Sequence, residues 1–208
     1  MNFGNLVEIT GKKGSGKTQV SFSICAINSI NNKKTLFIDG SGNFRPERIK
    51  SMIDKHLSNI SSSADKGNAY LKSIAYQRIY ELDDLIKLIK KIKLLNFELI
   101  ILDDIIPLFT YKFKDNIRLE VRNFIRELSL IALSEKKMIV LTNLVIEKMD
   151  KEGQNGHLCE FFFHYILRYV HYKFYLKVKH NNNNITECKL VHPFNISSSK
   201  TYFDFSNL

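Results

Sequence analysis

A short run of glycines and lysines near the N-terminus carries the residue types that bind phosphate. Residues 11–18 have the sequence Gly-Lys-Lys-Gly-Ser-Gly-Lys-Thr, which fits the pattern G-x-x-x-x-G-K-[ST] at every fixed position. In such a loop the glycines let the backbone wrap closely around a phosphate group, with the N–H groups pointing inward. Lys17 would reach the β- and γ-phosphates, and the Thr18 hydroxyl would bind Mg²⁺. The residues expected to hold a nucleoside triphosphate here are Gly11, Lys12, Lys13, Gly14, Ser15, Gly16, Lys17 and Thr18.

The segments on either side of this loop support the same interpretation. The apolar run at 6–9 predicts a short strand, and residues 19–30 predict a helix. Because the helix starts near Gly16, the positive end of its dipole would face the bound anion. A turn that is rich in glycine and lysine by chance is the alternative, and it would not require a strand before it and a helix after it.

A second candidate element is a buried strand that ends in a carboxylate. Residues 98–103 are apolar enough to be buried on both faces of a sheet, and they end at Asp103. In a parallel sheet, ligands gather at the edge formed by the carboxyl ends of the strands. Asp104 follows directly, but adjacent strand residues point to opposite sides, so Asp103 is the better candidate. We therefore predict Lys17 and Asp103 as catalytic residues, and Thr18 and Asp103 as the residues that hold Mg²⁺.

Strands and helices alternate along most of the chain. Further strands are expected at 35–39, 73–79, 98–103 and 137–142, with helices at 46–57, 82–95 and 117–133 and a loop at 58–68. From residue 167 onward only strands are expected, at 169–178, 185–191 and 201–205, and the first two form an antiparallel hairpin. The pattern predicts an α/β fold over 1–208 as a single domain, with a mostly parallel central sheet, helices on both faces and an antiparallel C-terminal hairpin.

Composition limits the partners and the compartment. The formal net charge of +10 suits a nucleic acid partner, although the four consecutive asparagines at 181–184 indicate a compositional bias that could also explain the charge. No apolar run approaches the ~20 residues of a membrane span, and the N-terminus lacks the pattern of a secretory signal. The three cysteines are far apart, which suits a reducing compartment rather than a disulfide framework.

Residues 37–48 resemble a segment of a known family. Their sequence F-I-D-G-S-G-N-F-R-P-E-R is similar to the Y-I-D-T-E-G-T-F-R-P-E-R segment of RecA-like recombinases of the archaeal RadA/RadB and eukaryotic strand-exchange type. Residues 14–19 resemble the phosphate loop of that family, residues 141–145 its I-T-N-Q-V segment, and the C-terminal strands its closing hairpin.

The resemblance covers nearly the whole chain as an ATPase core and is closest to the RadB-like branch. It implies a RecA-like P-loop NTPase core that uses ATP and Mg²⁺. It also implies that Gln19 belongs to the nucleotide site and that Arg48 stacks on adenine; the simpler alternative for Arg48 is a solvent-exposed helix residue.

Two departures from the family pattern bear on activity. Ser41 stands where the family carries the glutamate that activates the attacking water, a role that contributes ~10²–10⁴-fold in rate. Leu144 stands where a glutamine relays the γ-phosphate to a DNA loop. The resemblance therefore implies an ATP-binding accessory in DNA recombination and repair with weak hydrolysis. The alternatives are an active DNA-dependent ATPase or strand-exchange protein, with Asp39 or Asp104 as substitute base, and a small P-loop kinase.

The resemblance also predicts where partners bind. A first DNA-facing loop would lie at 107–116, where Tyr111, Lys112, Phe113 and Lys114 suit base stacking beside phosphate neutralisation; a partly buried surface loop is the alternative. A second loop, or an ordinary connection, would lie at 147–156.

We find no counterpart of the family's N-terminal DNA-binding domain or of its aromatic-x-x-Ala docking strand. The expected partners are single-stranded DNA and a RecA-like recombinase or paralogue, without membrane association. The expected location is the cytoplasm near the nucleoid, or the nucleus in a eukaryote.

Overall fold

The computed structural model describes residues 4–58, 67–110, 116–149, 156–179, 182–193 and 199–205. Its centre is a sheet with the strand order β3-β2-β4-β5-β1-β7-β8-β9, in which β6 pairs with β5 outside this path. The strands are β1 (Leu6–Gly11), β2 (Thr35–Asp39), β3 (Ile74–Arg78), β4 (Leu99–Asp103), β5 (Met138–Met149), β6 (Gly156–Glu160), β7 (Tyr172–Lys179), β8 (Asn182–His192) and β9 (Lys200–Asp204). The helices are α1 (Lys17–Ile30), α2 (Pro46–Ser58), α3 (Gly67–Leu71), α4 (Leu82–Ile92), α5 (Pro107–Thr110), α6 (Ile117–Ser134) and α7 (Phe163–Ile166).

The strands from β3 to β7 are all parallel to their neighbours along this path, and β8 and β9 are added antiparallel. Every residue of β2 and β4 is buried, which explains why their sequences are nearly continuous apolar runs. The predicted mostly parallel sheet with an antiparallel C-terminal hairpin is confirmed. Because the parallel strands share one direction, β1, β2, β4 and β5 all run toward the same edge of the sheet.

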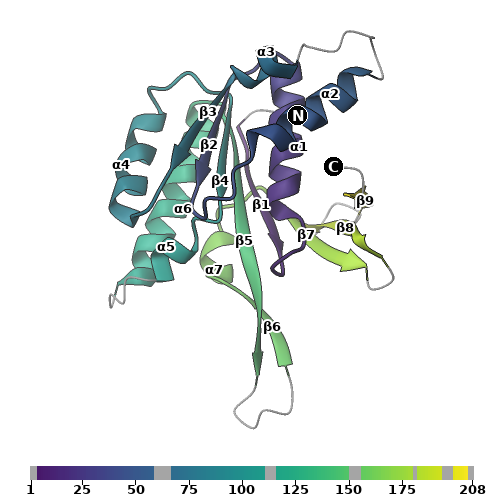
Figure 1. Cartoon of the computed structure of the whole chain (residues 1–208). Helices are drawn as coiled ribbons and strands as arrows, with labels where there is room; N and C mark the ends of the chain where they lie inside the picture. Colours follow the sequence, from purple (N-terminus) through teal and green to yellow (C-terminus); the bar gives the residue numbers. More distant parts are fainter. Residues whose placement is uncertain are drawn as a thin grey trace.

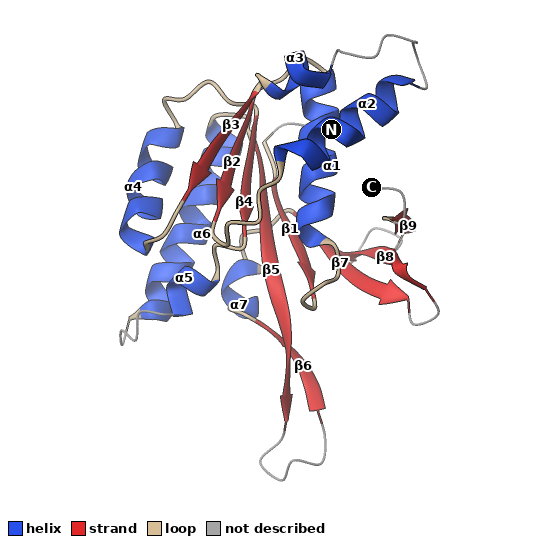
Figure 2. Cartoon of the chain, viewed as in Figure 1, coloured by secondary structure: helices blue, strands red, loops and turns tan. Residues whose placement is uncertain are grey.

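Helices cover both faces of the sheet, as predicted (Figures 1 and 2). On one face α1, α2 and α3 lie together, and their apolar residues form a buried cluster with β2 and β4 around Phe22, Phe37 and Ile53. On the other face α4 and α6 form a second cluster with residues of the same strands, including Leu85, Ile125 and Leu102. Among the described residues, no helix is long and apolar enough to cross a membrane.

The structure differs from the sequence prediction mainly after residue 142. Strand β5 continues to Met149 because Leu144 to Ile146 prolong its apolar, β-rich sequence, and β6 pairs antiparallel with this extension. The two strands form an arm that projects beyond the other strands (Figure 1). The ends of the second predicted loop, 147–149 and 156, are therefore strand residues, and 150–155 lie outside the described part of the chain.

Three short helices also depart from the prediction. Helix α3 begins at Gly67, inside the segment predicted as a loop at 58–68, and α5 occupies the start of the first predicted DNA loop. Residues 111–115, which carry the aromatic and lysine residues of that loop, lie outside the described residues. Helix α7 is a single turn that the sequence pattern did not indicate, because it is too short to show a helical period.

Candidate nucleotide site and neighbouring surfaces

The phosphate-binding pattern forms the connection between β1 and α1. Gly14 and Gly16 have φ angles of +78° and +87°, in the left-handed region that favours glycine. Within the turn, the Ser15 N–H donates a hydrogen bond to the Lys12 carbonyl at 3.1 Å. A methyl group at Gly11 would lie 2.4 Å from Ser15 Oγ, so only glycine fits where the loop closes. The loop thus has the conformation that its glycine spacing predicted.

Lys17 lies across this loop. Its ammonium group donates hydrogen bonds to the carbonyl oxygens of Gly11 and Lys12, both at 3.0 Å. Burial lowers the pKa of Lys17, while the nearby charges of Asp104 and Asp103 act in the opposite direction. The lysine is therefore held at the loop by weak neutral acceptors, which an anion could replace.

Asp103 and Thr18 meet at the start of α1, as predicted. The Thr18 hydroxyl donates to Asp103 Oδ2 at 2.8 Å, and the Thr142 hydroxyl of β5 donates to Oδ1 at 3.0 Å. The Asp103 side chain is buried, and this burial raises its pKa to about 6 in spite of both hydrogen bonds. Asp104 follows with a left-handed φ of +54°, and its N–H donates to Thr142 Oγ1 at 2.8 Å.

Asp39 organises the turn that contains Ser41. Its Oδ1 accepts hydrogen bonds from the N–H groups of Ser41 and Gly42, both at 2.8 Å, and from the Ser41 hydroxyl at 3.1 Å. Arg78 adds an ion pair at 3.2 Å. Burial acts to raise the pKa of Asp39, but the backbone hydrogen bonds outweigh it and the pKa is lowered. A carboxylate engaged in this way is a poor proton acceptor, so Asp39 is poorly suited to act as a substitute base.

Arg48 lies beside the start of α1. It lines a cavity of about 600 Å³ together with Thr18 and Gln19, and with Phe22, Asn43, Arg45 and Glu47. Gln19 Oε1 is buried and, among the described residues, has no hydrogen-bond partner. A polar atom in this condition is where a ligand hydroxyl or amino group would be accommodated. Gln19 and Arg48, predicted only from the resemblance, therefore share one hollow with Thr18.

The remaining loop residues face outward. Lys12 and Lys13 are exposed, and Lys12 forms an ion pair of 3.2 Å with Glu147 of β5. No group of three or more His, Cys, Asp or Glu side chains within the described ranges could hold a metal ion alone. A Mg²⁺ ion at Thr18 and Asp103 would thus depend on phosphate oxygens and water, which is the usual arrangement for this ion.

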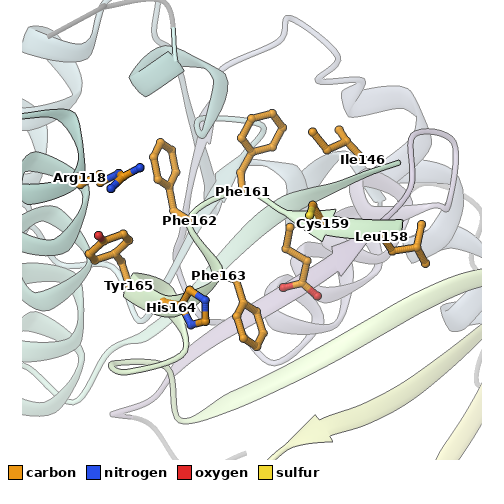
Figure 3. A pocket seen from close by; sticks show the side chains of 10 residues that line it. Arg118, Ile146, Leu158, Cys159, Phe161, Phe162, Phe163, His164 and Tyr165 are labelled. Atoms are coloured by element: carbon orange, nitrogen blue, oxygen red, sulfur yellow. The ribbon is translucent and has the colours of Figure 1, made fainter. Parts of the chain in front are cut away.

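A second cavity, which sequence reasoning missed, lies at the base of the arm (Figure 3). It measures about 690 Å³ and is lined by the consecutive rings of Phe161, Phe162 and Phe163 and by Arg118 from α6. Phe162 has a φ of +53°, a conformation that is rare for a bulky residue and costs about 1–2 kcal/mol. Three phenylalanines in a row were the available signal, but their run has no helical or strand period.

A buried ion cluster connects β1, β6 and β7. The Lys173 ammonium group contacts Glu8 at 2.9 Å and also pairs with Glu160, and the Asn143 amide donates to Glu8 at 2.8 Å. Burial raises the pKa of Glu8, which Lys173 opposes. Because Glu8 and Lys173 are 165 residues apart, their pairing could not be read from local sequence.

Comparisons with known proteins agree with this geometry. The family model described as Rad51 matches residues 1–161. The chain is 29% identical over 174 residues to a DNA repair and recombination protein RadB of Methanocaldococcus jannaschii, covering 79% of this chain and 77% of that protein. It is 28% identical over 162 residues to a DNA repair protein RAD51 homolog B of Zea mays, covering 71% of this chain but 46% of that protein.

The fold has a counterpart among solved structures. A crystal structure of the RadB recombinase superposes with a TM-score of 0.76 at 17% identity, covering 99% of this chain and 89% of that one. The chain spans less than half the length of the plant relatives that it matches. The RecA-like fold and the RadB-like resemblance predicted from the sequence are confirmed, and the chain belongs to the Rad51 family.

Proposed function

We propose that this protein binds ATP together with Mg²⁺ and acts in DNA recombination and repair as an accessory with weak ATP hydrolysis. The observation that carries the proposal is the combination of Lys17 at a glycine-shaped loop with the Thr18–Asp103 pair at 2.8 Å. The second part of the proposal depends on Ser41, which occupies the turn where the family carries a catalytic glutamate.

Each part of the nucleotide has a matching group. The N–H groups of residues 14–18 and the ammonium group of Lys17 would bind the phosphates. Thr18 and Asp103 would hold Mg²⁺, which neutralises charge on the phosphates when bound. Gln19 and Arg48 border the adjoining cavity, so the base and sugar would lie there.

The weak hydrolysis follows from the turn after β2. Ser41 Oγ donates to Asp39, and a hydroxyl is not a general base at neutral pH. Asp39 is occupied by its own turn and by Arg78. Asp104 is the acid that remains near Lys17, and burial raises its pKa while Lys17 opposes the shift. The alternative function, an active DNA-dependent ATPase, therefore depends on Asp104.

The same proposal includes single-stranded DNA as a partner. Arg118 lies in the first turn of α6, directly after the first predicted DNA loop. Phe161 follows β6, the strand that begins where the second predicted loop ends. Their cavity offers aromatic faces beside a cation, the combination that binds unpaired bases next to phosphate (Figure 3). A net charge of +10 favours a polyanion. A recombinase or paralogue as protein partner, and the nucleoid or the nucleus as location, complete the proposal.

The main test measures ATP affinity and ATP turnover with and without single-stranded DNA, using Lys17→Ala as the blank. We expect the substitution to weaken ATP binding by about 100-fold, because charge-assisted hydrogen bonds to phosphate are lost. Wild-type turnover should stay near the blank with and without DNA. Unchanged ATP affinity in Lys17→Ala would refute the nucleotide site, and strong DNA-stimulated turnover would favour the active ATPase.

The DNA contact is tested with Phe162→Gly. Glycine is the residue that tolerates a φ of +53° best, so the variant removes the ring without distorting the backbone. We expect the affinity for oligo-dT to fall about 5–160-fold, since stacking of one base is worth about 1–3 kcal/mol. Tyr80→Ala serves as the control, because Tyr80 is an exposed aromatic residue that follows β3, an edge strand of the sheet away from this cavity. Equal affinities for all three proteins would exclude base stacking in this cavity.

A further inference from the structure

We infer that the antiparallel C-terminal strands hold the phosphate loop in its binding conformation, and that Phe205 is the positioning residue that does so at Gly16. This inference rests on the proposed nucleotide site. It assigns a role to a part of the chain that supplies none of the residues of the phosphate-binding pattern. In Figure 1, β7 and β8 lie beside the end of α1 at which the loop arrives.

Strand β7, which is parallel to β1 and antiparallel to β8, lies beside the beginning of the loop. β7 pairs with β1 from Val7, opposite Tyr172, to Gly11, opposite Leu176. A methyl group at Gly11 would lie 2.6 Å from the Leu176 carbonyl oxygen. The loop therefore leaves the sheet directly against β7, with no space for a side chain between them.

The antiparallel strands contact the middle and the end of the loop. The hydroxyl of Thr186 in β8, which is buried, donates to the Ser15 carbonyl at 3.3 Å. The Phe205 ring, directly after β9, packs on Gly16, where a methyl group would lie 2.5 Å from its Cε2 atom. The strands β7 and β8 and the residue that follows β9 thus touch the loop at residues 11, 15 and 16.

Phe205 is itself held in a defined place. Its ring is stacked on that of Phe203, with centroids 6.1 Å apart and planes 7° apart. Phe203 lines an apolar groove of about 480 Å³ together with Ile24 and Ile27 of α1 and Phe174 of β7. The ring of Phe205 is therefore fixed through Phe203 of β9 and lies against Gly16, the residue directly before α1.

The contact matters because of what Gly16 does. Gly16 precedes α1 in a left-handed conformation, and the N–H groups that follow it are those that would bind phosphate. A binding loop gains affinity when its conformation is fixed before the ligand arrives. Without the ring, Gly16 would have the freedom of an unsupported glycine, and the N–H groups would be less well aligned.

The experiment compares two ligands, Mg²⁺-ATP and inorganic triphosphate with Mg²⁺, on the full chain. We expect Phe205→Ala to weaken both by about tenfold and by the same factor, because the loop binds the phosphates in each. Phe205→Tyr, which keeps the ring, should restore both affinities. Tyr202→Ala is the matched control, because Tyr202 is an aromatic residue of β9 that is half exposed.

Other results would overturn the inference. A loss for ATP alone would mean that Phe205 stacks on the base, and unchanged affinities for both ligands would mean that it does not act on the site. If thermal melting shows that Phe205→Ala fails to fold, Thr186→Val provides the second variant. It removes only the hydroxyl bonded to Ser15 and should weaken both ligands by about 2–5-fold.

Failure of this inference is distinguishable from failure of the proposed function. If the wild-type chain binds ATP in a Lys17-dependent way and the Phe205 and Thr186 variants behave like it, only the positioning role is wrong. If the wild-type chain does not bind ATP, or if Lys17→Ala binds it equally well, the nucleotide site itself is wrong and the positioning role fails with it.

Discussion

The phosphate loop and the turn from Asp39 to Phe44 lie at the same edge of the sheet, after β1 and after β2. In the loop, glycines adopt left-handed angles, and among the described residues the Lys17 ammonium group donates to two carbonyl oxygens. In the turn, hydrogen bonds and an ion pair to Arg78 occupy the Asp39 carboxylate. The loop is arranged to receive an anion, whereas the turn is satisfied within the protein.

In the proposed function, binding and hydrolysis therefore depend on separate parts of the same edge. The residues proposed to bind the phosphates and the metal ion belong to β1, to α1 and the loop between them, and to β4. The water-activating position belongs to the turn after β2, where Ser41 donates to Asp39. A change in the turn can therefore remove hydrolysis without disturbing the loop. Two substitutions test this separation: one restores a carboxylate in the turn, and the other changes the buried acid on the side of the loop.

The largest effect is expected from Ser41→Glu. A carboxylate at this position would return a general base to a site whose other parts are present, and such a base contributes ~10²–10⁴-fold. We expect ATP turnover to rise about 10–100-fold, because the rest of the turn is not optimised for it. Steady-state release of phosphate, with Lys17→Ala as the blank, measures the change.

The matched control is Ser41→Gln, which has the same length and no base. Equal turnover for the glutamate and glutamine variants would show that another group limits the reaction. ATP affinity should stay within about twofold in both variants, since Ser41 makes no contact with the loop in the described part of the chain. A large loss of affinity would contradict the separation of the two parts.

Much of the fold could be predicted because it depends on local patterns. The buried strands β2 and β4 are almost purely apolar, and their predicted limits differ from the observed ones by at most one residue. The glycine spacing specified the loop, since its left-handed positions need glycine. The arm formed by β5 and β6 was missed because the sequence after residue 142 resembled a loop-bearing segment of the family, although strand-forming residues continue there.

Residues of the site could be predicted where they belong to short contiguous motifs of the family. Thr18 and Asp103 were expected to lie together, and a hydrogen bond of 2.8 Å joins them, while the charges of Asp104 and Asp103 act on the pKa of Lys17. The ion pair of Asp39 with Arg78 and the contact of Phe205 with Gly16 depend on how distant segments are brought together, which no local period encodes. The same holds for Phe162, whose left-handed backbone is imposed by tertiary structure against its own preference.

A smaller effect is expected from Asp103→Asn, in the free energy of unfolding rather than in ATP turnover. The pKa of Asp103 is raised from 3.8 to about 6, mainly by burial, so the folded state binds this proton more tightly than the unfolded state. Native stability must therefore fall as the pH rises from about 4 to 6, and the full loss is present at pH 7. Without nucleotide, the asparagine variant should be more stable than the wild type by about 1–3 kcal/mol at pH 7.5.

The pH dependence distinguishes this cause from a general improvement in packing. At pH 4 both forms of residue 103 are uncharged in the folded protein, so urea unfolding should give nearly equal stabilities there. Asp84→Asn is the control, because Asp84 is exposed and paired with Lys87 on α4, and it should show no such trend. If Asp103→Asn raised the free energy of unfolding equally at pH 4 and at pH 7.5, burial of the charged carboxylate would not be the cause. The expected pattern would mean that the protein keeps a destabilising buried carboxylate at the position where Mg²⁺ and phosphate would compensate its charge.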